Sequence, residues 1–145
     1  MGIMRRPHTV LPIASLAVAA LIGTAAVSAQ DNGAYTAAQA TDGQAIFAAK
    51  CSMCHGAQLQ GGFGPTLVGP SFIADYQGRP VDEVRDFIAT AMPQNAPGSL
   101  APHDVLAVLS FILQKNHYPA GSAPLTEASS KTIKITTQPV PPDHG

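Results

Sequence analysis

The chain has 145 residues, of which 46% are hydrophobic and 12% are charged, and its formal net charge at pH 7 is −1. A near-neutral chain without a basic block is a poor match for nucleic acid, so we expect no nucleic-acid partner. The chain has two cysteines, Cys51 and Cys54, which excludes a zinc ribbon or knuckle built on two cysteine pairs. Its length allows one small domain.

The first 29 residues have the three parts of a secretory signal peptide. Arg5 and Arg6 come first, an apolar stretch follows, and Val27-Ser28-Ala29 precedes a change to polar sequence. We expect cleavage after Ala29 and export by the general secretory route into the periplasm. The alternative is a retained membrane anchor, because the apolar stretch is only slightly shorter than a bilayer span.

The first helix is predicted to begin at Thr41 or Asp42, since either side chain can cap a helix N-terminus. Its apolar residues recur at helical spacing as far as Cys51. The helix therefore leads directly into the segment that contains both cysteines.

That segment is the run Cys51-Ser52-Met53-Cys54-His55. Two thiols at this spacing can each add to a vinyl group of one porphyrin, and the adjacent imidazole can then bind the iron as an axial ligand. A redox dithiol is the main alternative, but such a motif is expected after a strand in a βαβ unit. We therefore expect one covalently attached haem c held by Cys51 and Cys54, with His55 on the iron.

Residues 56–78 show no strong periodicity and include a glycine-rich loop at 61–65. A second helix is predicted to begin at Pro80 and to end at Met92, because Pro93 follows. Its apolar residues at helical spacing are Val84, Phe87, Ile88 and Ala91.

The third helix is predicted to begin at Pro102, to carry Asp104 in its first turn and to break at Asn116. Most of its faces are apolar, which indicates deep burial. Ala101 stands where a serine or threonine cap is expected.

The second axial ligand is approached by elimination among the methionines and histidines, the commonest candidates. Three of these residues leave with the signal peptide, and Met53 is too close to His55 along the chain to reach the opposite face of the ring. The remaining candidates are Met92, His103, His117 and His144. Met92 is favoured, because it ends a helix and enters a proline-containing loop that can direct its side chain inward.

The order of several segments resembles that in the class I c-type cytochromes, which carry one haem. These segments are residues 43–47, the motif at 51–55, residues 61–67, Met92-Pro93 and a closing apolar helix. The resemblance implies an all-α, small cytochrome c fold, with three main helices plus loops wrapped around the covalently attached haem. It also implies roles for several single residues.

By this resemblance, the Pro65 carbonyl accepts a hydrogen bond from His55 and orients the imidazole. Gly43 and Phe47 are implied to pack the first helix against the last, near Leu106 and Phe111. The iron is implied to have His55 and Met92 as its two axial ligands.

A narrower resemblance covers residues 92–100 and 111–121, which look like the cytochrome domains associated with periplasmic quinoprotein dehydrogenases. It implies redox protein partners, with a periplasmic dehydrogenase as electron donor and an oxidase or another cytochrome as acceptor. A membrane contact is expected only if the leader is retained as an anchor.

With both axial positions filled, the expected function is electron transfer and not enzymatic catalysis. The alternatives are a fixed cytochrome subunit of a quinoprotein dehydrogenase complex, or a peroxidase or gas-binding haem protein.

The predicted organisation is a signal peptide at 1–29, an N-terminal extension at 30–40, the cytochrome c domain at 41–121 and a C-terminal tail at 122–145. The tail is predicted to be largely disordered, because prolines follow a short alternating stretch that is the only candidate strand.

Overall fold

The computed structural model describes residues 1–2 and 33–138. These residues form six helices and no strand, which confirms the predicted all-α fold. The helices are α1 (Ala37–Lys50), α2 (Ser52–His55), α3 (Gly69–Tyr76), α4 (Asp82–Ala91), α5 (Pro102–Lys115) and α6 (Glu127–Ser130). Apart from Met1 and Gly2, the predicted signal peptide lies outside the described residues. Within the described ranges, no helix has the length and apolar character needed to cross a membrane.

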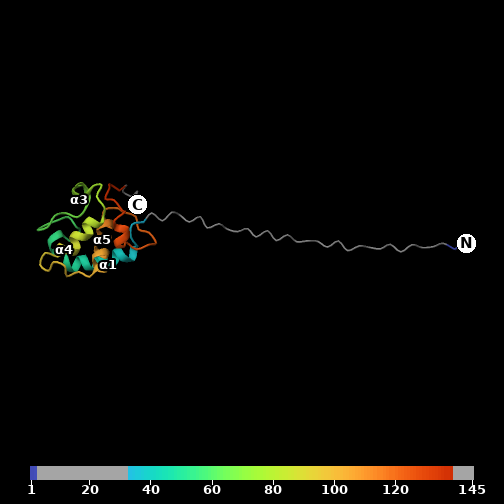
Figure 1. The fold of residues 1–145 in the computed structure, drawn as a ribbon, viewed down its shortest axis with the longest axis horizontal. Coiled ribbons are helices and arrows are strands. Elements are labelled where there is room, and N and C mark those ends of the chain that lie inside the picture. The colour runs from blue at the N-terminus through green and yellow to red at the C-terminus, as the bar shows by residue number, and fades with distance from the viewer. Residues whose placement is uncertain (3–32, 139–145) are drawn as a thin grey trace.

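Helix α5 lies in the middle of the folded part, next to α1 and α4 (Figure 1). Its residues from Val105 to Leu113 are buried with the exception of Leu106, as the apolar pattern predicts. The pairing of α1 with α5 is the most extensive helix contact in the described chain. The three main helices of the prediction are therefore α1, α4 and α5.

Gly43 makes the close approach of α1 and α5 possible. A Cβ atom at this position would collide with the backbone carbonyl of Ala107. One turn further along, the Phe47 and Phe111 rings pack with their centroids 5.5 Å apart and their planes tilted by 58°. Tilted aromatic pairs at this separation are favourable. The α1–α5 contact agrees with the packing that the resemblance implies for Gly43 and Phe47.

The start of α1 differs from the prediction. The helix begins at Ala37, and its cap is Thr36, whose hydroxyl accepts a hydrogen bond from the Gln39 backbone N–H at 3.2 Å. Thr41 lies inside the helix and donates its hydroxyl to the Ala37 carbonyl. The prediction of a cap at Thr41 or Asp42 was wrong because Thr36 is an equally good capping residue that lies earlier in the chain.

Helix α4 begins at Asp82, two residues later than predicted, with Val81 as its N-cap. Val84 and Ile88 are buried as the periodicity predicts, but Phe87 is 51% exposed. The apolar stripe is therefore narrower than the sequence indicates, because one face of α4 remains on the surface.

Helix α3 lies in the segment for which no periodicity was found. It has eight residues, which are too few to establish an apolar repeat, and it buries Phe72. Pro70 in its first turn is the signal that could have indicated a helix start. The Asn116 side chain connects the start of α3 to the end of α5, since it accepts from the Gly69 N–H and donates to the Leu67 carbonyl.

The prediction that the tail is largely disordered was wrong for residues 122–138. Leu125 and Ile135 are 1% and 0% exposed, and α6 lies between them in the chain. The backbone of Ile135 bonds to Gly78 and Arg79 in the connection between α3 and α4. The remaining residues, 139–145, lie outside the described residues.

Two tyrosines fasten this C-terminal segment to the rest of the fold. The Tyr118 hydroxyl accepts a hydrogen bond from the Thr136 N–H at 2.8 Å, and the Tyr35 hydroxyl donates to the Tyr118 carbonyl at 2.7 Å. Burial raises the pKa of the Tyr35 phenol above its ordinary value. Chain segments before α1 and after α5 are therefore joined on one side of the molecule.

Candidate cofactor site

A cavity of about 390 Å³, called here the central pocket, lies where α2 and the ends of α1 and α4 face α5. Its volume falls in the range of roughly 300–1,000 Å³ that is common for small-molecule and cofactor sites. The wall is mostly apolar, and its buried or half-buried members include Phe47, Leu67, Ile88, Val108 and Ile112. Sequence periodicity assigned most of these side chains to a core, which is also the pattern expected for the wall of an apolar cofactor pocket.

Helix α2 directs the sequence motif into the central pocket. Cys51 and Cys54 are free thiols, and together with His55 they line the cavity. Cys51 is half-buried, whereas Cys54 is exposed. Burial raises the pKa of the Cys51 thiol, and the nearby charge of Lys50 partly offsets that rise.

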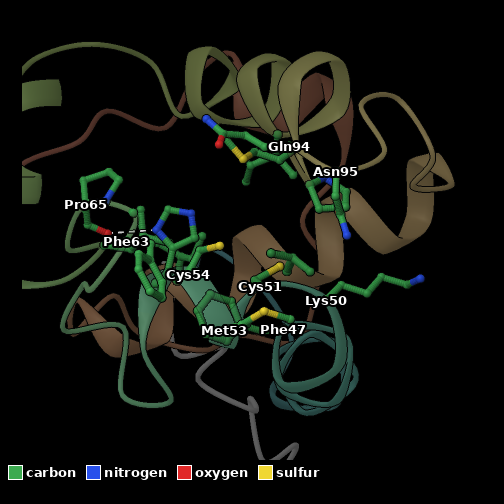
Figure 2. A pocket seen from close by; sticks show the side chains of 17 residues that line it. Phe47, Lys50, Cys51, Met53, Cys54, Phe63, Pro65, Gln94 and Asn95 are labelled. Atoms are coloured by element: carbon green, nitrogen blue, oxygen red, sulfur yellow. Dashed lines mark hydrogen bonds between the residues drawn. The ribbon is translucent and has the colours of Figure 1, made fainter.

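The His55 imidazole is fixed by the loop that follows α2. Its Nδ1 lies 2.8 Å from the Pro65 carbonyl oxygen, as the dashed line in Figure 2 marks. A carbonyl can only accept, so Nδ1 carries the proton and donates it. In the neutral ring, this hydrogen bond selects the tautomer in which the other nitrogen, Nε2, has the lone pair that an axial ligand of iron needs. This is the contact that the resemblance implies for Pro65.

The same loop leaves no space for the ring to move toward Gly64. A Cβ atom at Gly64 would lie 2.8 Å from Cε1 and 3.0 Å from Nδ1 of the imidazole. The Gly64 N–H donates to the Cys54 carbonyl at 2.9 Å, and the Gly61 N–H donates to the His55 carbonyl at 2.8 Å. These hydrogen bonds fold the glycine-rich loop against the motif, so the glycines allow both the turn and the contact with the ring.

Met92 approaches the central pocket from α4. It is the C-cap of that helix, with an extended backbone (φ −118°, ψ 152°), and its half-buried side chain lines the cavity. Neither His103 nor His117 lines the cavity. The His103 side chain is 83% exposed and pairs with Asp104, and His117 is on the surface. His144 lies outside the described residues.

Polar residues line the remaining part of the central pocket. Figure 2 shows Lys50 and Asn95 on the side away from Phe63 and Pro65, with Gln94 between α4 and the cavity. These three polar residues were not among the predicted site residues. The sequence holds no signal for them, because amides in a loop and a lysine at a helix end are common surface residues.

The residues of the central pocket fit a covalently held haem. Within residues 33–138 there is no group of three or more His, Cys, Asp or Glu side chains that could hold a metal by itself. A single imidazole with a free Nε2, two thiols beside it, a methionine from another helix and apolar walls are the groups that a porphyrin-bound iron requires. We conclude that the pocket suits haem and does not suit a bare metal ion.

Comparisons with known proteins agree with the interpretation of the pocket as a haem site. Residues 38–112 match the family described as "Cytochrome C oxidase, cbb3-type, subunit III". Among solved structures, the chain is similar to one in the crystal structure of the sulfane dehydrogenase SoxCD from Paracoccus pantotrophus, at 25% identity and a TM-score of 0.58. The match covers 72% of this chain and 57% of that one, so it spans little more than half of the SoxCD chain. No curated protein matches.

Proposed function

Because the chain belongs to the cbb3-type cytochrome c oxidase subunit III family and is a c-type cytochrome with covalently bound haem c, we propose that it shuttles single electrons in the periplasm. One observation carries this proposal. His55 from α2 and Met92 from the end of α4 line the same cavity as both cysteines. A haem held there has a side chain available for each of its two axial positions.

Each residue has a distinct part in the proposed function. Cys51 and Cys54 hold the ring through thioether bonds to its vinyl groups, and His55 and Met92 bind the iron. When bound, the haem supplies a one-electron couple at its iron. The Pro65 carbonyl, at 2.8 Å from Nδ1, orients the His55 ring and raises the basicity of Nε2 as a ligand.

Filled axial positions favour electron transfer over catalysis. With an imidazole and a thioether on the iron, oxygen, peroxide and other small ligands have no open position. Thioether ligation also favours the reduced state relative to a second imidazole, so the reduction potential is expected to be comparatively high. The protein then acts through its exposed haem edge and carries no catalytic residue.

The electron donor proposed for this chain is a dehydrogenase, and the acceptor is an oxidase or another cytochrome. Its solved neighbour occurs in the structure of a sulfane dehydrogenase, which supports a donor of the dehydrogenase class. The narrower sequence resemblance favours a quinoprotein dehydrogenase as that donor.

A second candidate function rests on the same neighbour. Similarity to a chain in a dehydrogenase structure is compatible with a fixed subunit, for which copurification with a catalytic chain is expected. A free carrier instead elutes as a monomer in size-exclusion chromatography and exchanges electrons with separately added partners. The elution of the protein in periplasmic extract is compared with that of the purified chain. Earlier elution in the extract supports the fixed subunit, and equal elution supports the free carrier.

The proposed location depends on the leader at residues 1–29. Removal of the leader leaves a mature protein that begins at Gln30. The intact mass of the haem-loaded protein tests this proposal, because cleavage after Ala29 lowers the mass by the whole leader. A protein that keeps the leader and stays with the membrane fraction would support the anchored alternative.

The experiment that tests the carrier function is exposure of the holoprotein to small ligands. Carbon monoxide added to the reduced protein, and cyanide added to the oxidised protein, are expected to leave the absorption spectrum unchanged over minutes. A Met92→Ala variant serves as the positive control, because it should bind both at once. Immediate binding by the wild-type protein would instead support the peroxidase or gas-binding alternative.

A further inference from the structure

Helix α4 depends on its neighbours for its place in the fold. Isolated helices shorter than roughly 12–15 residues are only marginally stable in water, and α4 has ten residues. No side chain caps its start. Its main contacts with other helices of the described chain are those with α5 and α6. Because Met92 is the C-cap of α4, whatever holds this helix in place also holds Met92.

The C-terminal segment, residues 122–138, holds the start of α4 by main-chain hydrogen bonds. The N–H of Val81, which is the N-cap of α4, donates to the Ile133 carbonyl at 2.9 Å. Just before it, the Gly78 N–H donates to the Ile135 carbonyl at 2.8 Å. Val81 and Ile135 are also fully buried, so apolar packing adds to these hydrogen bonds.

An ion pair joins the same segment to the first half of α4. Arg85 Nη1 lies 3.7 Å from Oε1 of Glu127 in α6, and the Arg85 side chain is only 15% exposed. The residues that line the central pocket include none from the C-terminal segment. Helix α4 spans about 15 Å, since each of its residues adds 1.5 Å. The segment therefore acts on Met92 through the helix and not by direct contact.

From these contacts we propose that the C-terminal segment keeps Met92 in position, and that its release opens the second axial position of the iron to small ligands. This inference rests on the proposed function, because it requires Met92 as a ligand. Release removes the hydrogen bonds and the ion pair at the start of α4, and the short helix then lacks the packing that it needs. The pairing of α1 with α5 persists, so this partial opening takes less free energy than unfolding of the whole protein.

Cyanide binding to the oxidised holoprotein measures how often Met92 leaves its position. The wild-type protein is expected to bind cyanide slowly, through rare release of the segment. Ile135→Ala should raise the binding rate about tenfold or more, because truncation of this buried side chain weakens the docked segment. Ile135→Val is a milder variant that keeps the fold, and it should raise the rate about threefold. A wild-type rate in Ile135→Val would overturn the proposal.

Ala40→Gly is the matched control for a general loss of stability. Ala40 is buried in α1, whose main contacts are with α2 and α5, and glycine destabilises a helix interior. This variant should unfold at a lower denaturant concentration than the wild-type protein but bind cyanide at the wild-type rate. Equal acceleration in Ala40→Gly and Ile135→Val would contradict the proposal, because cyanide would then enter by general unfolding.

Native-state hydrogen exchange gives an independent measure of the coupling between the segment and Met92. The Val81 N–H reports the contact with the segment, and the Met92 N–H, which donates to the Ile88 carbonyl at 3.2 Å, reports the end of α4. In Ile135→Val both amides should lose protection by the same factor, and in Ala40→Gly neither should. Loss of protection at Val81 alone would mean that the segment leaves without moving the ligand.

The wild-type protein separates failure of the proposed function from failure of this inference. If the proposed function fails, the oxidised wild-type protein binds cyanide at once. If only this inference fails, the wild-type protein binds cyanide slowly and Ile135→Val binds it no faster.

Discussion

At the scale of single residues, the His55 imidazole is held from two directions. The Pro65 carbonyl accepts a hydrogen bond from Nδ1 at 2.8 Å, and Gly64 lies against the ring with no space for a side chain. Both restraints come from one loop that is itself bonded to the Cys54 and His55 carbonyls. The orientation of the proposed ligand therefore depends on a loop in which a side chain at position 64 would press on the ring.

We predict that Gly64→Ala destabilises the holoprotein by about 1 to 3 kcal/mol, because the added methyl group must push the imidazole away from Pro65. The shifted imidazole should also change the reduction potential. Denaturant unfolding and potentiometric titration measure the two effects.

Gly78→Ala is the control for this prediction. Gly78 has φ of +79°, and a Cβ there meets no atom within 4 Å, so alanine costs stability through backbone strain alone. Its reduction potential should equal that of wild type. A Gly64→Ala protein with wild-type potential would show that the loop does not control the ligand.

The sequence could predict the site residues that lie close together along the chain. Cys51, Cys54 and His55 lie within five consecutive positions, so the chain itself holds them together. Met92 could be reached only by elimination, and the structure adds that it shares a cavity with them whereas His103 and His117 do not.

At the level of the helices, the N-termini differ in whether a side chain caps them. The Thr36 side chain caps the start of α1, whereas Ala101, the N-cap residue of α5, provides no side-chain hydrogen bond. The long apolar helix α5 was predictable because many buried positions repeat. Helix α3 was not, since eight residues that pack one aromatic ring carry too little pattern.

We predict that Ala101→Ser stabilises the protein by roughly 0.5 to 1 kcal/mol, because Ala101 already has the extended backbone (φ −66°, ψ 152°) of a helix cap. The reverse change at α1, Thr36→Ala, should cost about 1 kcal/mol, since it removes the hydrogen bond to the Gln39 N–H. Chemical denaturation of both variants measures the difference. A destabilising Ala101→Ser would mean that the first turn of α5 cannot accept the hydroxyl.

At the scale of the whole molecule, residues 122–138 complete the fold. Ile135 is fully buried, and its backbone bonds to the connection between α3 and α4. The segment was predicted to be largely disordered because Pro139, Pro141 and Pro142 follow its short alternating stretch. Its order depends on contacts with residues that are distant in sequence, which leave no local pattern. Examples are the hydrogen bonds of Gln39 with the Leu125 backbone and those of Gly78 and Arg79 with the Ile135 backbone.

We predict that Ile135→Ala lowers the free energy of unfolding by about 2 to 4 kcal/mol, the usual cost of truncating a buried isoleucine. Ile133→Ala is the matched control in the same segment and should cost less, because Ile133 is only partly buried. Thermal and denaturant unfolding of the holoprotein compare the two. Equal small losses would indicate that the C-terminal segment is not part of the cooperative fold.

In the proposed function, His55 and Met92 together bind the iron of one covalently attached haem. The absorption spectrum of the oxidised protein tests this pair of ligands, because sulfur-to-iron ligation gives a weak band in the far red. We expect the wild-type protein to have this band and Met92→Ala to lose it. An unchanged spectrum in Met92→Ala, or a wild-type protein without the band, would exclude Met92 as a ligand.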